Sequence, residues 1–466
     1  MTVTSPRPSF YTLKDISTLP QLQNLPAATR EAMQVVAHVL PFRTNNYVVE
    51  QLIDWSAAPD DPIFQLTFPQ QGMLPGAKFD RMAKALRTGD AATIRQTADS
   101  IRLSLNPHPE GQKQYNVPSL DAVPVPGIQH KYRETVLVFP SAGQTCHAYC
   151  SFCFRWAQFV GLQDLKFATD ESMTFQRYLR QHQEVTDVLF TGGDPMVMRT
   201  ELVARYIEPL LAPEFDHIQT IRIGTKSLTF WPYRYTSDKD ADDLLRLFER
   251  ITAAGKNLAI MAHFNHHQEL RTPVMREAAA RVRSTGAVIR TQAPLVRNIN
   301  DDATVWSTMW QQQVKLGMIP YYMFIERDTG AKAYFSVPLT RAVEIYRNAM
   351  SHVSGLARSA RGPVMSALPG KVCLHGVADV GGERVFVASF LQGRNASWCG
   401  RPFFAQFDNN SYWLNDLRPA FGESEFFYEG ELRELLSRST HDACVTPTVT
   451  TSSVDPTDSD PFTLSI

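Results

Sequence analysis

Six short apolar segments alternate with longer amphipathic segments over the middle of the chain. The apolar segments cover residues 134–139, 185–190, 221–225, 257–264, 287–295 and 320–325. The segments between them have helical periodicity. In 240–254 the apolar face consists of Leu244, Leu247, Phe248 and Ile251, and Gly255 follows where glycine commonly ends a helix. Strands that alternate with helices predict a parallel sheet. Six such units predict an α/β fold, a partial (β/α)6 TIM-like barrel, whose functional residues would gather beyond the carboxyl ends of the strands.

Three regions of different composition surround a predicted central domain at residues 126–371. Residues 1–125 contain patches of helical periodicity, such as 29–40 and 91–105, and predict a helical N-terminal region. Residues 372–444 are rich in aromatic side chains and predict a folded C-terminal extension packed on the barrel. Residues 445–466 contain no Lys or Arg and many Ser, Thr and Pro, which predicts a disordered tail.

The overall composition excludes several classes of protein. The formal net charge of −1 gives no reason to expect nucleic acid or an acidic membrane as the main partner. Six cysteines in 466 residues are too few for a disulfide scaffold and indicate a reducing compartment. The first residues show no secretory signal pattern, and no apolar run approaches the length of a membrane span. We therefore expect a cytoplasmic protein with no nucleic-acid or membrane partner.

Three of the six cysteines, Cys146, Cys150 and Cys153, lie within eight residues at CxxxCxxC spacing. Thiolates are the ligands that iron–sulfur clusters require. Three thiolates on a 4Fe-4S cluster leave one iron without a protein ligand, and an open position lets a metal bind a substrate. Two alternatives are a zinc site, with His147 or a remote cysteine as fourth ligand, and a chance clustering of buried cysteines. Zinc sites usually show paired CxxC units, which this segment lacks.

This cysteine spacing, with Phe152 before the last cysteine, is the signature of radical S-adenosylmethionine enzymes, and the chain resembles that superfamily. Further blocks follow one another as in the lysine 2,3-aminomutase family. They are "PGIQHKYRETVLVF" (126–139), "CSFCFRWAQFVG" (150–161), "FTGGDPMVM" (190–198), "RIGTKSLTFWPYRYT" (222–236), "HFNHHQEL" (263–270), "LVRNINDD" (295–302) and "IPYYMF" (319–324). The resemblance covers roughly residues 38–375, and the chain is identified as a divergent member of the family.

The resemblance implies that the open iron is chelated by the amino and carboxylate groups of S-adenosylmethionine. It places the turn formed by Gly192, Gly193, Asp194 and Pro195 beside the methionyl amino group, where glycines allow a close approach of the backbone. By itself this turn is also typical of an ordinary connection between a strand and a helix. Three polar residues at or near strand ends could line the same face or be satisfied structural residues: Arg222, His263 and Gln292.

The resemblance also implies a second cofactor, pyridoxal phosphate, held as an imine by a lysine that follows a proline and a run of glycines. The matching stretch makes Lys371 the candidate, although only Gly370 remains of the glycine run. A solvated surface lysine is the alternative. Arg155 matches the arginine that holds the substrate carboxylate, a task that suits its planar fork, and the alternative is a structural salt bridge.

Departures from the family pattern concern the substrate. Members that act on lysine carry two aspartates for its distal ammonium group, and the matching positions here are Arg327 and Ser366. Such a change excludes lysine and suits a substrate with a distal carboxylate, such as glutamate. A shift of one residue would instead place Asp328 at the first position, next to Glu326.

Two further departures concern contacts to the cofactors and to zinc. Thr135 replaces a family arginine, which puts part of the phosphate or substrate contact set in doubt. The C-terminal zinc cluster of some relatives is also missing, so we expect no zinc and expect three buried cysteines, Cys373, Cys399 and Cys444.

The sequence therefore predicts a radical S-adenosylmethionine isomerase that generates a 5′-deoxyadenosyl radical and moves an amino group from the α to the β carbon of an amino acid. Expected partners are a small amino acid substrate, an electron donor such as flavodoxin or ferredoxin, and a second copy in a homo-oligomer. Two alternatives stay open at this point. One is a radical enzyme on the same scaffold without pyridoxal phosphate, and the other is a non-catalytic iron–sulfur or zinc module.

Overall fold

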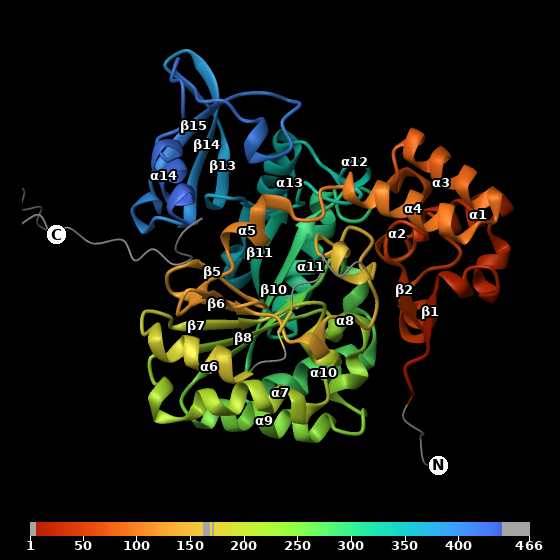
Figure 1. The fold of residues 1–466 in the computed structure, drawn as a ribbon, viewed down its shortest axis with the longest axis horizontal. Helices are drawn as coiled ribbons and strands as arrows, with labels where there is room; N and C mark the ends of the chain where they lie inside the picture. Colours follow the sequence, from red (N-terminus) through yellow and green to blue (C-terminus); the bar gives the residue numbers. More distant parts are fainter. Residues whose placement is uncertain (1–5, 162–167, 170–171, 440–466) are drawn as a thin grey trace, which may run out of the picture.

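A mixed sheet of eleven strands forms the centre of the molecule (Figure 1). The structure is a computed structural model that describes residues 6–161, 168–169 and 172–439. The predicted disordered tail, 445–466, lies outside the described residues. The strand order is β15-β14-β13-β12-β11-β10-β9-β8-β7-β6-β5, and the sheet is open, because its end strands β5 and β15 do not pair with each other within the described ranges.

The middle of this sheet is parallel and confirms the α/β prediction. The six predicted strands are β6 (Thr135–Val138), β7 (Asp187–Phe190), β8 (Thr220–Thr225), β9 (Asn257–His263), β10 (Val288–Leu295) and β11 (Ile319–Ile325). All of them pair in parallel, and the sequence missed a seventh parallel strand, β12 (Arg361–Ser366). At the edge, β5 (Ile128–Tyr132) is antiparallel to β6.

Two short helices, α8 (Ser227–Phe230) and α12 (Lys332–Phe335), follow β8 and β11. A longer helix follows each of the six predicted strands. These helices are α6 (Ser172–Gln181), α7 (Thr200–Ile207), α9 (Ala241–Ala253), α10 (Pro273–Ser284), α11 (Ala303–Lys315) and α13 (Leu339–Ser351). Figure 1 shows α6, α7, α9 and α10 along one side of the sheet. Burial alternates along β8 and β10, so one face packs in the main hydrophobic core and the other carries polar residues such as Arg222 and Gln292. The α9 helix ends just before Gly255, as predicted, where φ is +80°.

The N-terminal region packs over the segment that carries the three cysteines. Its main helices are α1 (Ala27–Ala37), α2 (Pro62–Thr67), α3 (Gly76–Thr88), α4 (Ala91–Leu103) and α5 (Gln112–Tyr115), and a small ribbon pairs β1 (Phe10–Thr12) with β2 (Arg43–Asn45). A second hydrophobic core joins α1, α2, α3 and α4 to Ala148, Phe152 and Trp156. The cysteine segment is therefore enclosed between this region and the sheet.

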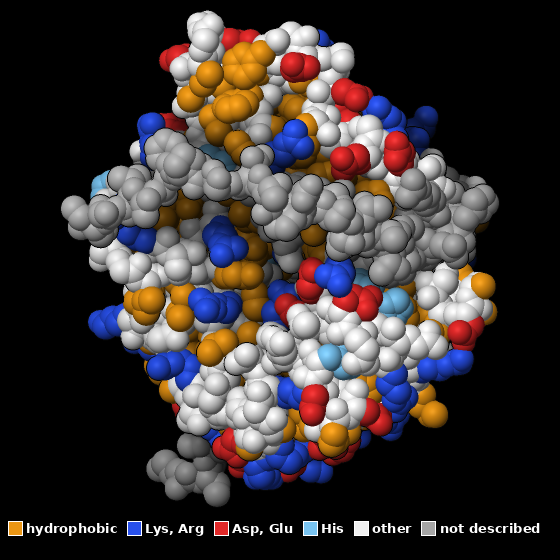
Figure 2. Space-filling view, turned by 90° about the vertical axis from the view of Figure 1, so that its left-hand side faces the viewer, with side chains coloured by type: hydrophobic (Ala, Val, Ile, Leu, Met, Phe, Trp, Pro, Cys, Tyr) orange, Lys and Arg blue, Asp and Glu red, His pale blue; other side chains and the backbone are white. Residues whose placement is uncertain are grey.

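The C-terminal extension continues the central sheet. Its strands β13 (Gly370–Val380), β14 (Glu383–Gly393) and β15 (Pro402–Gln406) are antiparallel, and α14 (Glu429–Ser439) follows them. The boundary expected after residue 371 thus falls inside β13. Val380 and Phe421 are exposed here, and Figure 2 shows hydrophobic side chains gathered at this end of the molecule.

None of the helices in the described ranges is both long and apolar enough to cross a lipid bilayer.

Candidate active site

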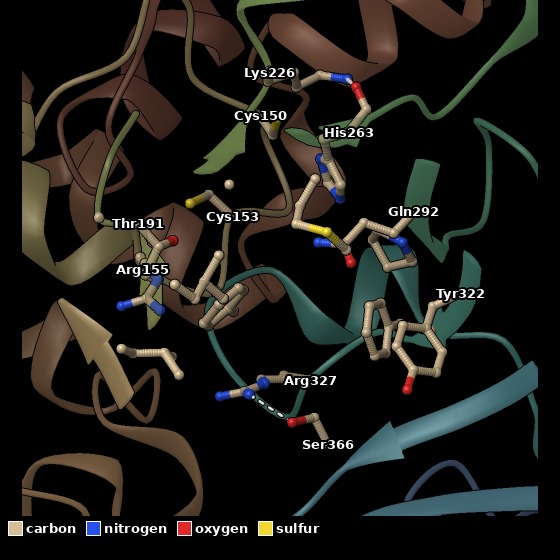
Figure 3. Close-up of a pocket in the computed structure, with 18 of the residues that line it drawn as sticks. Cys150, Cys153, Arg155, Thr191, Lys226, His263, Gln292, Tyr322, Arg327 and Ser366 are labelled. Atoms are coloured by element: carbon tan, nitrogen blue, oxygen red, sulfur yellow. Dashed lines mark hydrogen bonds between the residues drawn. The ribbon is translucent and has the colours of Figure 1, made fainter. Parts of the chain in front are cut away.

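A cavity of about 330 Å³ lies at the carboxyl ends of the parallel strands. Its walls come from β5 to β13 and from the cysteine segment, which are far apart in sequence. Nearly all of the predicted site residues line it: Cys146, Cys150, Phe152, Cys153, Arg155, Gly192, Gly193, Asp194, Arg222, His263, Gln292, Arg327 and Lys371. Pro195 is the exception. Figure 3 shows Cys150 and Cys153 on one side of this space, with Arg327 and Ser366 on the other.

Backbone contacts from the N-terminal region hold the cysteine segment in place. The Tyr149 amide donates to the Arg43 carbonyl at 2.8 Å, and the Ser151 amide donates to the Leu66 carbonyl at 2.9 Å. Asn45, which is fully buried, donates from Nδ2 to the carbonyls of His147 at 3.0 Å and Phe230 at 2.9 Å. The sequence analysis missed these anchors, because none of them belongs to a recognisable motif.

The three thiols face one space but do not form a single-ion site. Burial raises the pKa of Cys153 to about 11 and raises that of Cys146 and Cys150 further, so a metal would have to displace their protons. Within the described residues, no three His, Cys, Asp or Glu side chains converge as one metal ion requires. His147 lies outside the cavity lining and stacks on Trp231 at 6.4 Å. A donor set made of thiolates alone is the kind that iron–sulfur clusters use.

The glycine turn after β7 packs directly on the cysteine segment. The Asp194 amide donates to the Thr145 carbonyl at 2.7 Å. A Cβ on Gly193 would lie 2.4 Å from that carbonyl oxygen, and Gly192 has φ +149°. Glycine is therefore required at both positions because of contacts within the protein, with Gln144 and Thr145.

The Asp194 carboxylate braces the ends of two neighbouring strands. It accepts hydrogen bonds from Thr225 Oγ1 at 2.6 Å and from the Lys226 amide at 2.8 Å. Burial raises the pKa of Asp194 to about 6. Its carboxylate thus connects the turn after β7 to the end of β8 at the cavity wall.

His263 and Gln292 face each other across β9 and β10, and the next strand brings Tyr322 opposite Gln292. Burial lowers the pKa of His263 to about 3, so its imidazole is neutral. Lys226, which the sequence analysis did not single out, also lines this wall. Its ammonium group pairs with the buried Glu269 at 2.6 Å. The wall beside Cys150 therefore presents neutral polar groups and one compensated charge.

Two arginines share one aromatic ring at the opposite wall. The Arg155 guanidinium lies 4.9 Å from the centre of the Phe154 ring, and the Arg327 guanidinium lies 4.4 Å from it. Neither forms a salt bridge with a carboxylate in the part of the chain that the structure describes. Burial lowers the pKa of both groups. Arg155 therefore has no salt-bridge partner among these residues, contrary to the alternative of a structural salt bridge.

The structure also distinguishes Arg327 from its acidic neighbours. Arg327 donates to Ser366 Oγ at 3.0 Å, whereas Asp328 pairs with Lys332 at 3.1 Å and does not line the cavity. Glu326 is buried, and its carboxyl oxygens have no hydrogen-bond partner among the described residues. Burial raises its pKa well above the usual range. Arg327 and Glu326 thus line the cavity, whereas Asp328 does not.

Lys371 lies at the start of β13 and reaches into the cavity wall, contrary to the solvated-lysine alternative. Its ammonium group lies between the rings of Tyr132, at 5.5 Å, and Tyr322, at 5.2 Å. It donates to Gln392 Oε1 at 2.7 Å. Burial, together with the nearby positive charge of Arg222, lowers the pKa of Lys371 to about 7.

The remaining predicted polar residues have ordinary structural contacts. Arg222 lines the cavity and its side chain also forms a salt bridge of 2.7 Å with Asp187. It is therefore both a cavity residue and a satisfied structural residue. Thr135, the residue that replaces a family arginine, is buried in the cavity wall. Lys131, four residues earlier on β5, places a cation in the same wall and donates to the Ala367 carbonyl.

Comparison with known proteins identifies the family. No family model matches the sequence. A putative L-lysine 2,3-aminomutase of Aquifex aeolicus is 31% identical over 414 residues, which cover 88% of this chain and 96% of that protein. The chain belongs to the lysine 2,3-aminomutase family. The L-lysine 2,3-aminomutase of Fusobacterium nucleatum is 29% identical over 234 residues, and the glutamate 2,3-aminomutase of Clostridioides difficile is 28% identical over 235 residues. The chain spans about half the length of these two relatives, 52% and 51%.

Lysine 2,3-aminomutases are radical S-adenosylmethionine enzymes, and this divergent member keeps the three-cysteine segment. One expectation about the other cysteines is wrong. Cys373 is buried as expected, but Cys399 is exposed, because the preceding turn buries Trp398 in its place. Cys444 lies outside the described residues.

Proposed function

We propose that this chain is an amino acid 2,3-aminomutase of the radical S-adenosylmethionine type, built on a partial (β/α)6 barrel, and that its substrate is not lysine. One observation supports the proposal above all others. The cysteine segment with Arg155, the glycine turn and Lys371 come from three distant parts of the sequence and line one cavity.

The residues present fit a cluster and S-adenosylmethionine. Cys146, Cys150 and Cys153 would hold a 4Fe-4S cluster, and the methionyl group would lie beside Gly192 and Gly193, which line the same cavity. Phe152, His263 and Gln292 would line the nucleoside side. When bound, this pair supplies a 5′-deoxyadenosyl radical that abstracts hydrogen from a substrate carbon.

The opposite wall fits pyridoxal phosphate. Lys371 would hold the cofactor between Tyr132 and Tyr322, and Lys131 offers a cation on the strand where Thr135 replaces the family arginine. When bound, the cofactor supplies a π system that accepts an unpaired electron while nitrogen moves between carbons. With a pKa near 7, part of the Lys371 population is a neutral amine, which is the form that reacts with a carbonyl group.

Two guanidinium groups would recognise the substrate. Arg155 would bind the α-carboxylate, and Arg327 with Ser366 would bind a distal group. The Arg327 guanidinium, which has the Glu110 carboxylate nearby, would repel a distal ammonium and attract a distal carboxylate. The substrate class we propose is an amino acid with a distal carboxylate, such as glutamate. The aromatic rings around these groups would exclude water from the reacting atoms.

An electron donor such as flavodoxin or ferredoxin, a cytoplasmic location and a homo-oligomeric state belong to the same proposal. The cytoplasm suits five cysteines that are free thiols within the described residues.

Anaerobic reconstitution tests the proposal. The protein should bind iron and sulfide, form 5′-deoxyadenosine with a chemical reductant, and convert one of the common amino acids to its β-amino isomer. Conversion of glutamate but not lysine would support the substrate class, and efficient conversion of lysine would refute it. A reconstituted protein that forms no 5′-deoxyadenosine would refute the enzyme class.

A further inference from the structure

The C-terminal extension reaches the cavity through one cross-strand pair. Lys371 on β13 lies directly opposite Gln392 on β14, and its Nζ donates to Gln392 Oε1 at 2.7 Å. No other part of the proposed function uses Gln392. The pair links the catalytic lysine proposed above to a segment in which the sequence shows no motif.

An irregularity in the ladder brings these two side chains together. Val372 faces Phe390, but the next pair is Lys371 with Gln392, so Leu391 is an extra residue of β14. Bulges of this kind redirect side chains and are common next to active sites. In a regular ladder Lys371 would face Leu391, whose side chain has no hydrogen-bond acceptor.

The backbone around the pair is tightly packed. A Cβ on Gly370 would lie 2.2 Å from the carbonyl oxygen of Gln392, so only glycine fits before the lysine. Ala367 and Gly370 exchange backbone hydrogen bonds of 2.9 and 3.2 Å, which closes a tight turn between β12 and β13. Arg394 then donates to the Leu368 carbonyl at 2.9 Å. Lys371 therefore extends from a fixed hairpin, where the family pattern has a longer glycine run.

Gln392 is a neutral acceptor in charged surroundings. Titratable and charged groups surround Lys371: Lys131 and Tyr132 on β5, Asp187 on β7, Arg222 on β8, Tyr322 on β11, Arg327 just after β11, and Arg361 on β12. The one carboxylate among them, Asp187, is already paired with Arg222 at 2.7 Å. A carboxylate in place of the Gln392 amide would favour the charged form of the lysine, and an apolar side chain would disfavour it.

We propose that Gln392 is a positioning residue, whose amide oxygen holds the Lys371 amine at the cavity wall without supplying a counter-charge, so that the amine stays available as a nucleophile. The inference rests on the role of Lys371 in the proposed function. It adds a residue of the C-terminal extension to the machinery of the site.

Reductive methylation of Lys371 tests this inference in the full chain without added cofactor. Formaldehyde and cyanoborohydride label neutral amines, and mass spectrometry reports the labelling rate of Lys371 against pH. The midpoint should move up by about one pH unit or more in Gln392→Glu and move down in Gln392→Met. Gln406→Glu, the same change on β15, should leave it unchanged. Equal midpoints in all variants, or shifts of the same sign in both Gln392 variants, would overturn the inference. If Gln392→Glu does not fold, the labelling midpoint of Lys371 in Gln392→Met alone decides whether the inference holds.

A second measurement separates this inference from the proposed function. Wild-type protein incubated with pyridoxal phosphate and reduced with borohydride should carry the cofactor on Lys371. Absence of that label, with the midpoints shifted as expected, would refute the cofactor role and leave the positioning role of Gln392 intact. Presence of the label, with unshifted midpoints, would refute the positioning role alone.

Discussion

Arg327 and Ser366 meet across the cavity wall, joined by a hydrogen bond of 3.0 Å from Nη2 to Oγ. They are the two positions where the family resemblance expects aspartates for a lysine side chain. The structure brings the two side chains into contact, so the departures from the family pattern at both positions alter the same part of the cavity wall. Because Arg155 and Arg327 flank the same Phe154 ring, that part of the wall also lies within reach of the group that would bind the α-carboxylate.

Reversing the charge at Arg327 should therefore change substrate preference. We expect Arg327→Asp to lower kcat/KM for a dicarboxylic amino acid by roughly 100-fold, which corresponds to about 3 kcal/mol of lost transition-state binding. Steady-state assays of β-amino product would measure it. Arg347→Asp, the same change at an exposed site on α13, should have no effect. An Arg327→Asp enzyme with unchanged kcat/KM would show that this wall does not select the substrate.

The three clustered cysteines should be indispensable for iron, and the others should not. Replacing Cys146, Cys150 or Cys153 by Ala removes one of three thiolates, so each variant should lose most of its iron after reconstitution and all formation of 5′-deoxyadenosine. Iron and sulfide analysis with electron paramagnetic resonance would measure the loss. Cys399→Ala should retain full iron, because this cysteine is exposed and does not line the cavity. Equal iron in all four variants would exclude the cluster.

The parallel half of the fold was predictable because each strand is an apolar run next to an amphipathic helix. The six predicted strands agree with β6 to β11 within two residues at every end. The seventh, β12, was missed because Gly362 and Pro363 interrupt it, and these residues argue against a central strand. The strands β13 to β15 lack a clear period, since they run from the buried core to an exposed end.

The candidate site was predictable where function imposes a local pattern, as in the cysteine spacing and the glycine turn. Residues that act through one tertiary contact left no such pattern. Gln392 lies 21 residues after Lys371 and faces it because of a bulge in the β13–β14 ladder. Asn45 donates a hydrogen bond to a carbonyl group 185 residues away. Such contacts depend on sheet register, which a single sequence does not reveal.

Removing the Lys371 amine should stabilise the protein in a pH-dependent manner. Burial lowers the pKa of Lys371 from its ordinary 10.5 to about 7, so between these values the unfolded chain binds more protons than the folded chain. Stability conferred at this site therefore rises with pH over that range, and the cost of burying the ammonium is fully present below about pH 7. Lys371→Met should gain about 1–3 kcal/mol near pH 6, less than the full burial cost because water reaches this half-buried side chain. The gain should shrink towards pH 10.

Urea unfolding at several pH values would measure this change. Lys239→Met, at an exposed lysine before α9, should show no such dependence. A gain in the Lys371 variant that grew with rising pH would contradict the assignment of a buried amine.

Asn45 should control how firmly the cysteine segment is held. Its Nδ2 group satisfies the carbonyls of His147 and Phe230, and its Oδ1 accepts from the Val48 amide at 3.0 Å, all in a fully buried position. Asn45→Ala leaves three backbone groups unpaired and should cost about 2–4 kcal/mol of unfolding free energy. The segment would then open more often, so bound iron should be lost faster to a chelator.

Asn46→Ala provides a matched control, because its hydrogen bonds to Arg7 and Ser9 are exposed and its removal should cost less than about 1 kcal/mol. If both variants released iron at the wild-type rate, the contacts of Asn45 with the cysteine segment would play no part in retaining the cluster.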